Sequence, residues 1–246
     1  MSEKDLHALA TALRTGDTDA WLGAFSKAPR VNAQRGGVLG GPAPVSTWVE
    51  ESAQWLAELD ARYEPGLALA DGDHLVSEGT FWITVKGEEV DLPFVMIADR
   101  DGERVSEIRT YHSQWPYLGT HAFRAPPTER REVDKIPSVF TDYIARISAA
   151  EVDTVLASFT DDGYVREPAG NRWKHAGKEG REAFYRHLEN APRATFDLRT
   201  CTRGDGVTVV EYAFAYGDVD MVGGVCVMEH DDERIHAVRI TDDVAA

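Results

Sequence analysis

The sequence carries the same order of structural signals twice. Apolar residues recur at helical spacing in residues 6–13 and again in residues 139–147. Each run is followed by a shorter helical run that ends at a single aromatic residue, Phe25 or Phe159. A short strand, a glycine-containing loop and a further helix come next in each half. Because only two copies are present, the pattern predicts a duplicated domain and not a solenoid. The short strands are expected at residues 30–32 and 164–166, and the further helices at residues 46–59 and 178–188.

The second part of each half predicts an antiparallel sheet. Strand-like runs are separated by turn sequences such as Asp71-Gly72 and Asp101-Gly102. The closing strands match best, with residues 103–110 resembling residues 233–240. We therefore expect an α+β fold in which helices pack on one face of a curved, mainly antiparallel sheet, twice over. The strands are expected at residues 67–70, 75–85, 90–98 and 105–112, and at residues 195–203, 207–216, 223–229 and 235–242.

The segment between the halves has the composition of a linker. It holds Pro126-Pro127, Pro137 and a charged run over residues 129–135, which predicts an extended chain over a surface. The predicted domains are residues 1–120 and 137–246, joined by residues 121–136.

The charge and composition exclude several classes of partner. The net charge is −16, and the 26 basic residues are scattered, whereas nucleic acid and anionic membranes require clustered Lys and Arg. No apolar run approaches the roughly 18 residues that span a bilayer, and the charged start predicts no signal peptide. Cys201 and Cys226 have no CxxC spacing and are expected to be packing residues in a reduced compartment. We expect a cytoplasmic protein.

The second half resembles a known family through four segments. Tyr143-Ile144, residues 159–162, residues 167–170 and residues 184–186 follow the order and spacing of the ketosteroid isomerases with about one insertion. These enzymes belong with SnoaL-like polyketide cyclases among the nuclear-transport-factor-two-like proteins. The resemblance implies a cone-shaped, cystatin-like α+β roll in each half. Family members pair through the open sheet face, so fusion implies an intrachain pseudo-dimer, present as a monomer or a homodimer. The tandem arrangement also resembles an actinobacterial family.

The resemblance implies roles for three residues of the second half. Glu167 occupies the position of the general base, Tyr143 that of the oxyanion donor, and Tyr185 that of a supporting tyrosine. Two positions depart from the family. Its oxyanion-stabilising aspartic acid aligns with Val225, which cannot donate, and an apolar tryptophan of the pocket aligns with Asp242. The sequence therefore does not predict a steroid isomerase.

The predicted chemistry rests on paired carboxylates. A general base works best when its pKa lies near the working pH, and an apolar surrounding moves a carboxyl group in that direction. On the last strand, Val238, Ile240 and Asp242 share one face by the period of two. If that face lines the cavity, Glu167 and Asp242 divide the base and acid roles, with Tyr143 as hydrogen-bond donor. Such a pair suits enolisation, aldol-type ring closure or epoxide opening by water.

Each of these residues also has a structural interpretation. Glu167 can be a turn residue paired with an arginine, Tyr143 can anchor its helix to the sheet, and Asp242 can be a solvated strand end. In the first half, Ala33 stands at the base position, so a degenerate pocket is expected, and His112 occupies the place of Asp242. His175 is expected in a loop that closes over the mouth of the cavity. The residues expected to contact a ligand are Tyr185, His175, Phe159, Tyr212, Val225, Val238, Ile240 and His112.

No motif in the sequence indicates a metal or a cofactor. The eight histidines include no HxH or HExxH spacing, and there is no GxGxxG, GxxxxGK[ST] or GxSxG motif. Residues 36–41 are glycine-rich and are expected to form a flexible loop. The sequence therefore predicts a cofactor-free acid/base enzyme of isomerase, cyclase or hydratase type, acting on a small, mostly apolar molecule in residues 137–246. The alternative is a non-catalytic module of the same fold that binds a hydrophobic ligand or a protein.

Overall fold

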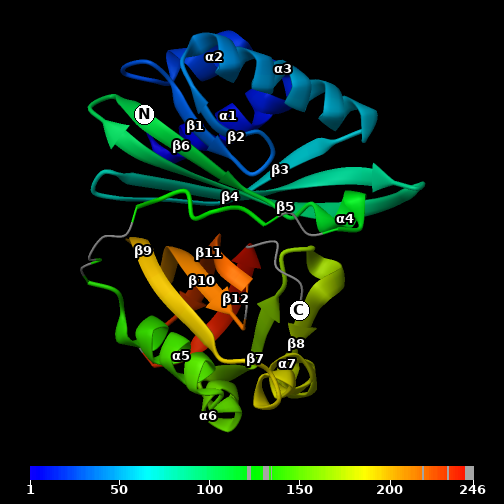
Figure 1. The fold of residues 1–246 in the computed structure, drawn as a ribbon, viewed down its shortest axis with the longest axis vertical. Coiled ribbons are helices and arrows are strands. Elements are labelled where there is room, and N and C mark those ends of the chain that lie inside the picture. The colour runs from blue at the N-terminus through cyan, green and yellow to red at the C-terminus, as the bar shows by residue number, and fades with distance from the viewer. Residues whose placement is uncertain (121–122, 130–132, 134, 218, 232, 242–246) are drawn as a thin grey trace. The chain divides into compact units, whose positions relative to one another are not determined.

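The computed structural model describes residues 1–241 apart from 121–122, 130–132, 134, 218 and 232. The chain divides into two compact units, Met1–His121 and Ala122–Ala246, here called the first and the second unit. Each unit contains one six-stranded sheet with helices (Figure 1). The predicted α+β class with two similar halves is confirmed.

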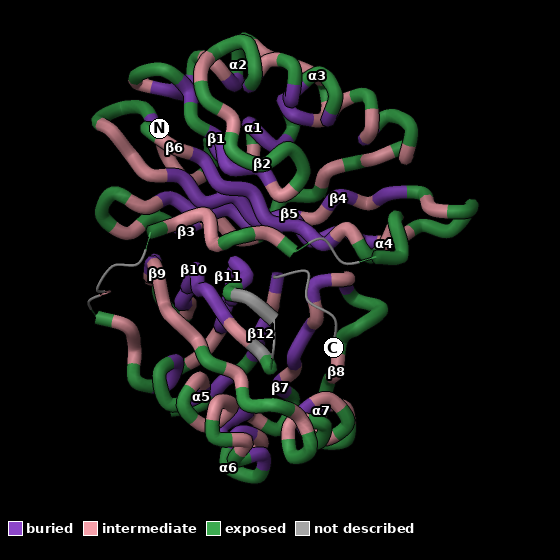
Figure 2. Tube along the Cα trace, in the orientation of Figure 1, coloured by how far each residue is buried: buried purple, intermediate pink, exposed green. Residues whose placement is uncertain are grey.

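The sheet of the first unit has the strand order β2-β1-β6-β5-β4-β3. Neighbouring strands are antiparallel except β1 and β6, which run parallel with Val31 opposite Ile108. Figure 2 shows that β5 is buried over much of its length. The elements are α1 (Glu3–Thr15), α2 (Thr18–Gly23), β1 (Arg30–Ala33), β2 (Gly37–Gly40), α3 (Pro42–Glu58), β3 (Arg62–Asp71), β4 (His74–Val85), β5 (Glu88–Asp101), β6 (Arg104–Tyr111) and α4 (Trp115–Leu118).

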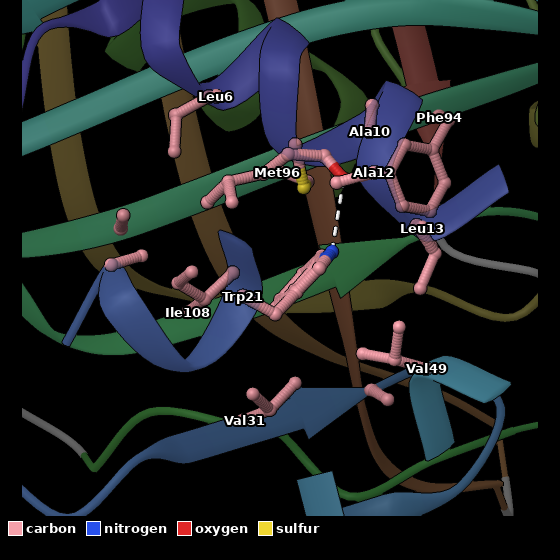
Figure 3. Close-up of a cluster of buried hydrophobic side chains, with 14 of the residues drawn as sticks. Leu6, Ala10, Ala12, Leu13, Trp21, Val31, Val49, Phe94, Met96 and Ile108 are labelled. Carbon is pink, nitrogen blue, oxygen red and sulfur yellow. Dashed lines mark hydrogen bonds between the residues drawn. The ribbon is translucent and has the colours of Figure 1, made fainter. Parts of the chain in front are cut away.

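Helices α1, α2 and α3 lie together on one face of the sheet of the first unit (Figure 1). Helix α1 buries Leu6, Leu9 and Leu13, which recur at helical spacing and form its apolar face. Trp21 of α2 packs into the same core, and its indole N–H donates to the Leu9 carbonyl oxygen at 3.0 Å (Figure 3). This bond satisfies the one polar group of a fully buried tryptophan, so α1 and α2 are held together at their crossing.

The prediction of a flexible loop over residues 36–41 is wrong. Gly37–Gly40 form β2, which pairs antiparallel with β1 so that Arg30 lies opposite Gly40. A short glycine-containing strand is stable here because its backbone groups hydrogen-bond to β1, although its side chains bury little surface.

The second unit repeats the arrangement with the strand order β8-β7-β12-β11-β10-β9. Strands β7 and β12 are the parallel pair, and the other neighbours are antiparallel. The elements are α5 (Ser138–Ala149), α6 (Val152–Ala157), β7 (Phe159–Arg166), the 3₁₀ helix η1 (Asn171–Trp173), β8 (Lys174–Ala176), α7 (Gly177–Tyr185), the 3₁₀ helix η2 (Arg186–Glu189), β9 (Ala194–Gly204), β10 (Val207–Tyr216), β11 (Val219–His230) and β12 (Ile235–Thr241).

The sheet of the second unit bends where β9 and β10 change register. Glu211 lies opposite Thr200 and Tyr212 opposite Leu198, so Arg199 is an extra residue on β9. A bulge of this kind increases the local bend and twist of a sheet. Helix α5 packs against β9 at one side of the sheet, and α7 packs against β7 and β8 at the other. The two helices therefore approach the same face from opposite sides.

Residues 123–128, here called the strap, lie against the sheet of the second unit. The Arg124 carbonyl accepts a hydrogen bond from the Gly223 amide at 3.0 Å, and the Thr128 carbonyl accepts one from Arg199 at 3.2 Å. A Cβ atom on Gly223 would lie 2.7 Å from Pro127 Cδ, so only glycine lets the strap approach β11 this closely.

None of the helices in the described part of the chain is long and apolar enough to cross a bilayer.

Candidate functional site

The second unit contains an apolar cavity of about 110 Å³ between α5, α7 and the sheet. Its wall comes from both helices, from η2 and from strands β9 to β12. The bulge in β9 and the two-residue period of β10 turn aromatic side chains of the sheet toward the helices. The lining residues are Tyr143, Ile144, Ile147, Phe184, Tyr185, His187, Leu188, Phe196, Tyr212, Phe214, Cys226 and Ile240.

Two tyrosines meet at the cavity wall. The Tyr143 hydroxyl from α5 lies 2.8 Å from the Tyr185 hydroxyl at the end of α7, and the two residues are only 2% and 1% exposed. The Phe159 ring packs against both rings, at 6.3 Å from Tyr143 and 5.9 Å from Tyr185. These contacts fix the direction of both side chains. The structure thus brings together the two tyrosines that the resemblance selected.

The phenols stay protonated at neutral pH. Burial raises the pKa of Tyr143 well above its usual value, and the neighbouring Tyr185 raises it further. Burial also raises the pKa of Tyr185 strongly, although the hydrogen bond from Tyr143 lowers it in part. Both groups are therefore hydrogen-bond donors and not phenolates.

The hydroxyl pair has one proton to spare. Two hydroxyls carry two protons, and their mutual hydrogen bond uses only one of them. No second partner of Tyr143 or Tyr185 occurs among the residues that the structure describes. The remaining O–H group can therefore donate to an oxygen atom of a molecule in the cavity.

Glu167 does not line this cavity. It follows β7 directly, and its Oε1 lies 2.6 Å from Nε2 of His175 on β8. Both side chains are mostly buried, with 18% of Glu167 and 23% of His175 exposed. The His175 ring packs on the Phe184 ring, with 5.0 Å between the ring centres. Of these two residues, Phe184 lines the cavity and His175 does not. The glutamate therefore pairs with a histidine and not with an arginine, and the pair lies behind Phe184.

His175 also differs from its predicted surroundings. It was expected in a loop over the cavity mouth, but it lies on β8, where it pairs with Val165 of β7. This pairing brings His175 to Glu167, which is eight residues away in the sequence. The side chain reaches the cavity only through Phe184.

The other predicted ligand contacts divide into two groups. Tyr212 and Ile240 line the cavity. Phe159 and Val238 belong to the buried core beside it and do not line it. Val225 does not line the cavity. The strand register places the next residue, Cys226, opposite Ile240 in the cavity wall. Because successive side chains of a strand point to opposite faces, Val225 points away from the cavity. Asp242 lies outside the described residues.

The sequence interpretation missed a cluster at the end of α7. Phe184, His187 and Leu188 all line the cavity, and their spacing of three and four residues places them on one helical face. That spacing was visible in the sequence. His187 is the residue of this cluster with acid/base chemistry.

The corresponding space in the first unit is nearly filled, with about 10 Å³ left. That volume is about the size of one water molecule. His112 is packed between aromatic rings, 5.9 Å from Trp55 and 5.9 Å from Phe94, and the Tyr117 hydroxyl lies 3.4 Å from its Nε2. His112 is therefore a packed residue of a closed pocket in this structure.

Among the described residues, no group of three or more His, Cys, Asp and Glu side chains is arranged to hold a metal ion.

Comparisons with known proteins give the fold and no closer relative. No protein-family model matches the sequence, and no curated protein is significantly similar to it. Among solved structures, a Catenulispora acidiphila protein with a ketosteroid isomerase-like fold, in complex with trimethylamine, is 18% identical with a TM-score of 0.40. It covers 48% of this chain and 92% of its own. A nuclear-transport-factor-two-like protein of unknown function from Cytophaga hutchinsonii is 18% identical, with a TM-score of 0.37 and coverage of 45% and 98%.

SalBIII, an epoxide hydrolase/cyclase-like enzyme of pyran ring formation in the polyether salinomycin, is also similar. It is 15% identical with a TM-score of 0.37, and the match covers 42% of this chain and 87% of SalBIII. Each of these matches covers less than half of this chain and most of the other protein. The resemblance drawn from the sequence is confirmed as a likeness of fold.

Proposed function

We propose that the second unit binds a small, mostly apolar organic molecule through an oxygen atom and transfers a proton within that molecule. The class of reaction is isomerisation, cyclisation or hydration, and the chain's own side chains carry the proton. One observation carries the proposal: a buried hydroxyl pair, 2.8 Å apart, has an unused proton at the wall of an apolar cavity.

The surroundings of the pair favour charge stabilisation over simple binding. A donor in an apolar cavity gains more from an oxygen atom that becomes negative than from a neutral carbonyl, because little solvent screens the interaction. The rings are fixed by Phe159 and by each other, at 6.4 Å between the Tyr143 and Tyr185 rings, so little reorganisation is needed. The arrangement therefore supports stabilisation of an enolate or alkoxide.

The size and lining of the cavity define the ligand class. An apolar cavity of about 150 Å³ holds one benzene ring in a protein studied for that purpose. The cavity of the second unit, at about 110 Å³, is smaller and is lined by aromatic and aliphatic side chains. A ligand with one ring and one oxygen substituent is therefore the upper limit of size, and the ring would lie between Ile144, Phe196 and Phe214.

Binding without turnover is the second candidate, and one observation favours it. Glu167 is engaged with His175 and does not line the cavity, so the predicted base is not in contact with a bound molecule. The two candidates share the donor pair and differ only in whether a group accepts a proton from the ligand.

The test of the donor pair uses 4-nitrophenol, whose phenolate resembles an enolate and absorbs visible light. We expect the wild-type protein to bind it and to shift it toward the phenolate. The Tyr143→Phe/Tyr185→Phe double variant, which removes every hydroxyl of the pair, should weaken that shift by at least about tenfold, because a hydrogen bond to a charged group contributes about 1.5–3 kcal/mol. Tyr164→Phe is the matched control, since Tyr164 bonds to Arg239 and does not line the cavity. An equal shift in the Tyr143→Phe/Tyr185→Phe double variant, or no binding at all, would refute the proposal.

A further inference from the structure

We propose that His187 is the proton acceptor of this cavity. The inference rests on the proposed function, since it assigns the group that removes a proton from the bound molecule. His187 lies in η2, directly after α7, and lines the same cavity as the hydroxyl pair. His187 is exposed to solvent, so a captured proton can pass to water.

Two contacts to Phe184 fix the imidazole ring. The Nδ1 atom of His187 is hydrogen-bonded to the Phe184 carbonyl oxygen, and the Phe184 ring packs edge-on at 5.6 Å and 78°. A carbonyl oxygen only accepts hydrogen bonds, so Nδ1 must carry the proton in the neutral ring. The lone pair then lies on Nε2, which has no partner among the described residues. The backbone of α7 thus selects the tautomer in which Nε2 is basic.

The rest of the described lining offers no comparable base. The aliphatic and phenylalanine side chains cannot accept a proton, and the Tyr143–Tyr185 pair is a donor. The lining also holds Tyr212 and Cys226, but a phenol or a thiol ordinarily carries its proton near neutral pH. An imidazole is the side chain that exchanges protons near neutral pH, and His187 is the one imidazole in the described cavity wall. The Glu167–His175 pair lies on the other side of Phe184. The cavity wall therefore contains a buried donor pair and a solvent-exposed acceptor.

The proposed step is balanced in protons and electrons. A C–H bond beside the ligand's oxygen-bearing carbon breaks, and its proton forms an N–H bond on Nε2 of His187. The electron pair remains on the ligand and is carried by the oxygen atom that accepts the hydrogen bond from the tyrosine pair. The imidazolium then returns the proton to another ligand atom or releases it to solvent, which restores the neutral ring.

The first part of the test measures the tautomer and requires no ligand. Long-range ¹H–¹⁵N spectra of the full chain with labelled histidine, assigned by comparison with His187→Gln, report which ring nitrogen carries the proton. The proposal expects a protonated Nδ1 and a bare Nε2 in the neutral ring. The opposite tautomer would overturn it, whatever the outcome for the hydroxyl pair.

The second part follows ionisation of bound 4-nitrophenol. Wild-type protein should form the phenolate and show a new proton on Nε2 of His187. In His187→Gln the phenol should still bind, with its ionisation constant reduced by about tenfold or more, because an opposite charge within about 4–6 Å shifts a pKa by about 1–3 units. His236→Gln, on an exposed position of β12, is the matched control and should behave as wild type.

The outcomes separate the two proposals. Ionisation that depends on Tyr143 and Tyr185 but is unchanged in His187→Gln would overturn the assignment of His187 and leave the donor pair in place. Loss of ionisation in His175→Gln, with His187→Gln unaffected, would also overturn it and would return the acceptor role to the Glu167–His175 pair. Absence of binding in the wild type would refute the proposed function, while the tautomer measurement still decides the geometry of His187.

Discussion

Removing the hydroxyl groups of Tyr143 and Tyr185 singly and together tests whether they form the isolated pair that the structure shows. Each single change to phenylalanine leaves the other hydroxyl buried beside apolar side chains without its partner at 2.8 Å. An unsatisfied buried hydroxyl costs about 1–3 kcal/mol, whereas removing both partners of a bond costs far less than the sum. We therefore expect each single variant to lose about 1–2 kcal/mol and the double variant to lose no more than either.

The measurement must report on the second unit alone, because a chain with two compact units need not unfold in one step. Hydrogen exchange of the β10 and β11 amides at increasing urea gives the free energy of opening for that unit. The four proteins of the cycle then yield a coupling energy, expected at about 1 kcal/mol or more. Additive losses in the double variant would show that the hydroxyls do not interact, and the argument for a spare proton would fail.

The same pair predicts behaviour at high pH. Burial raises the pKa of both phenols above their unfolded value of about 10. A group whose pKa is raised on folding contributes stability that is present below its unfolded pKa and is lost as the pH rises above it. The tyrosinate absorbance that appears during alkaline unfolding should therefore be smaller in the double variant by the contribution of the two removed phenols. Early titration of Tyr143 or Tyr185 in the folded protein would contradict their burial.

Two further predictions concern contacts outside the cavity. Burial opposes ionisation of Asp99, but hydrogen bonds from His74 at 2.9 Å and from Arg109 at 2.8 and 3.0 Å hold its pKa far below the usual range. Asp99→Asn should therefore destabilise the first unit by about 3 kcal/mol near neutral pH. The difference in unfolding free energy between wild type and variant should fade as the pH drops below about 4. Urea unfolding at several pH values measures that difference. Gly223→Val should displace the strap and expose it to proteolysis. Gly40→Val is the control, because a Cβ atom at Gly40 meets open space. Equal rates of cleavage in the two variants would contradict the close packing of the strap against β11.

The helices and the long strands could be predicted because their side chains follow clear periods. Helix α1 presents an apolar face at helical spacing, and the closing strands β6 and β12 have similar sequences in the two halves. The short strands β2 and β8 escaped prediction. Each is three or four residues long, lies at the edge of its sheet and buries little, so its stability comes from backbone pairing that leaves no pattern in the sequence.

The candidate site was predictable in its residue types and less so in its contacts. Tyr143 and Tyr185, which the resemblance selected, lie in contact although 42 residues separate them. The Glu167–His175 contact depends on the pairing of β7 with β8. Which of Val225 and Cys226 lines the cavity depends on the register of β11 against β12, where a shift of one residue reverses the two faces. His187 joins the wall because η2 continues the direction of α7 beyond Tyr185. Strand register and helix continuation are set by tertiary packing and cannot be inferred from spacing alone.

Proton transfer in the second unit is tested most directly by exchange of the α-hydrogens of cyclohexanone in D₂O, followed by ¹H NMR. Cyclohexanone has one ring and one carbonyl oxygen, as in the proposed class of ligand. We expect catalysed exchange in the wild type that falls by about a hundredfold in the Tyr143→Phe/Tyr185→Phe variant, since loss of a donor to a developing oxyanion costs about 10²–10³ in rate. Exchange no faster than in that variant, in a protein that still binds 4-nitrophenol, would contradict the claim and identify the second unit as a binding protein.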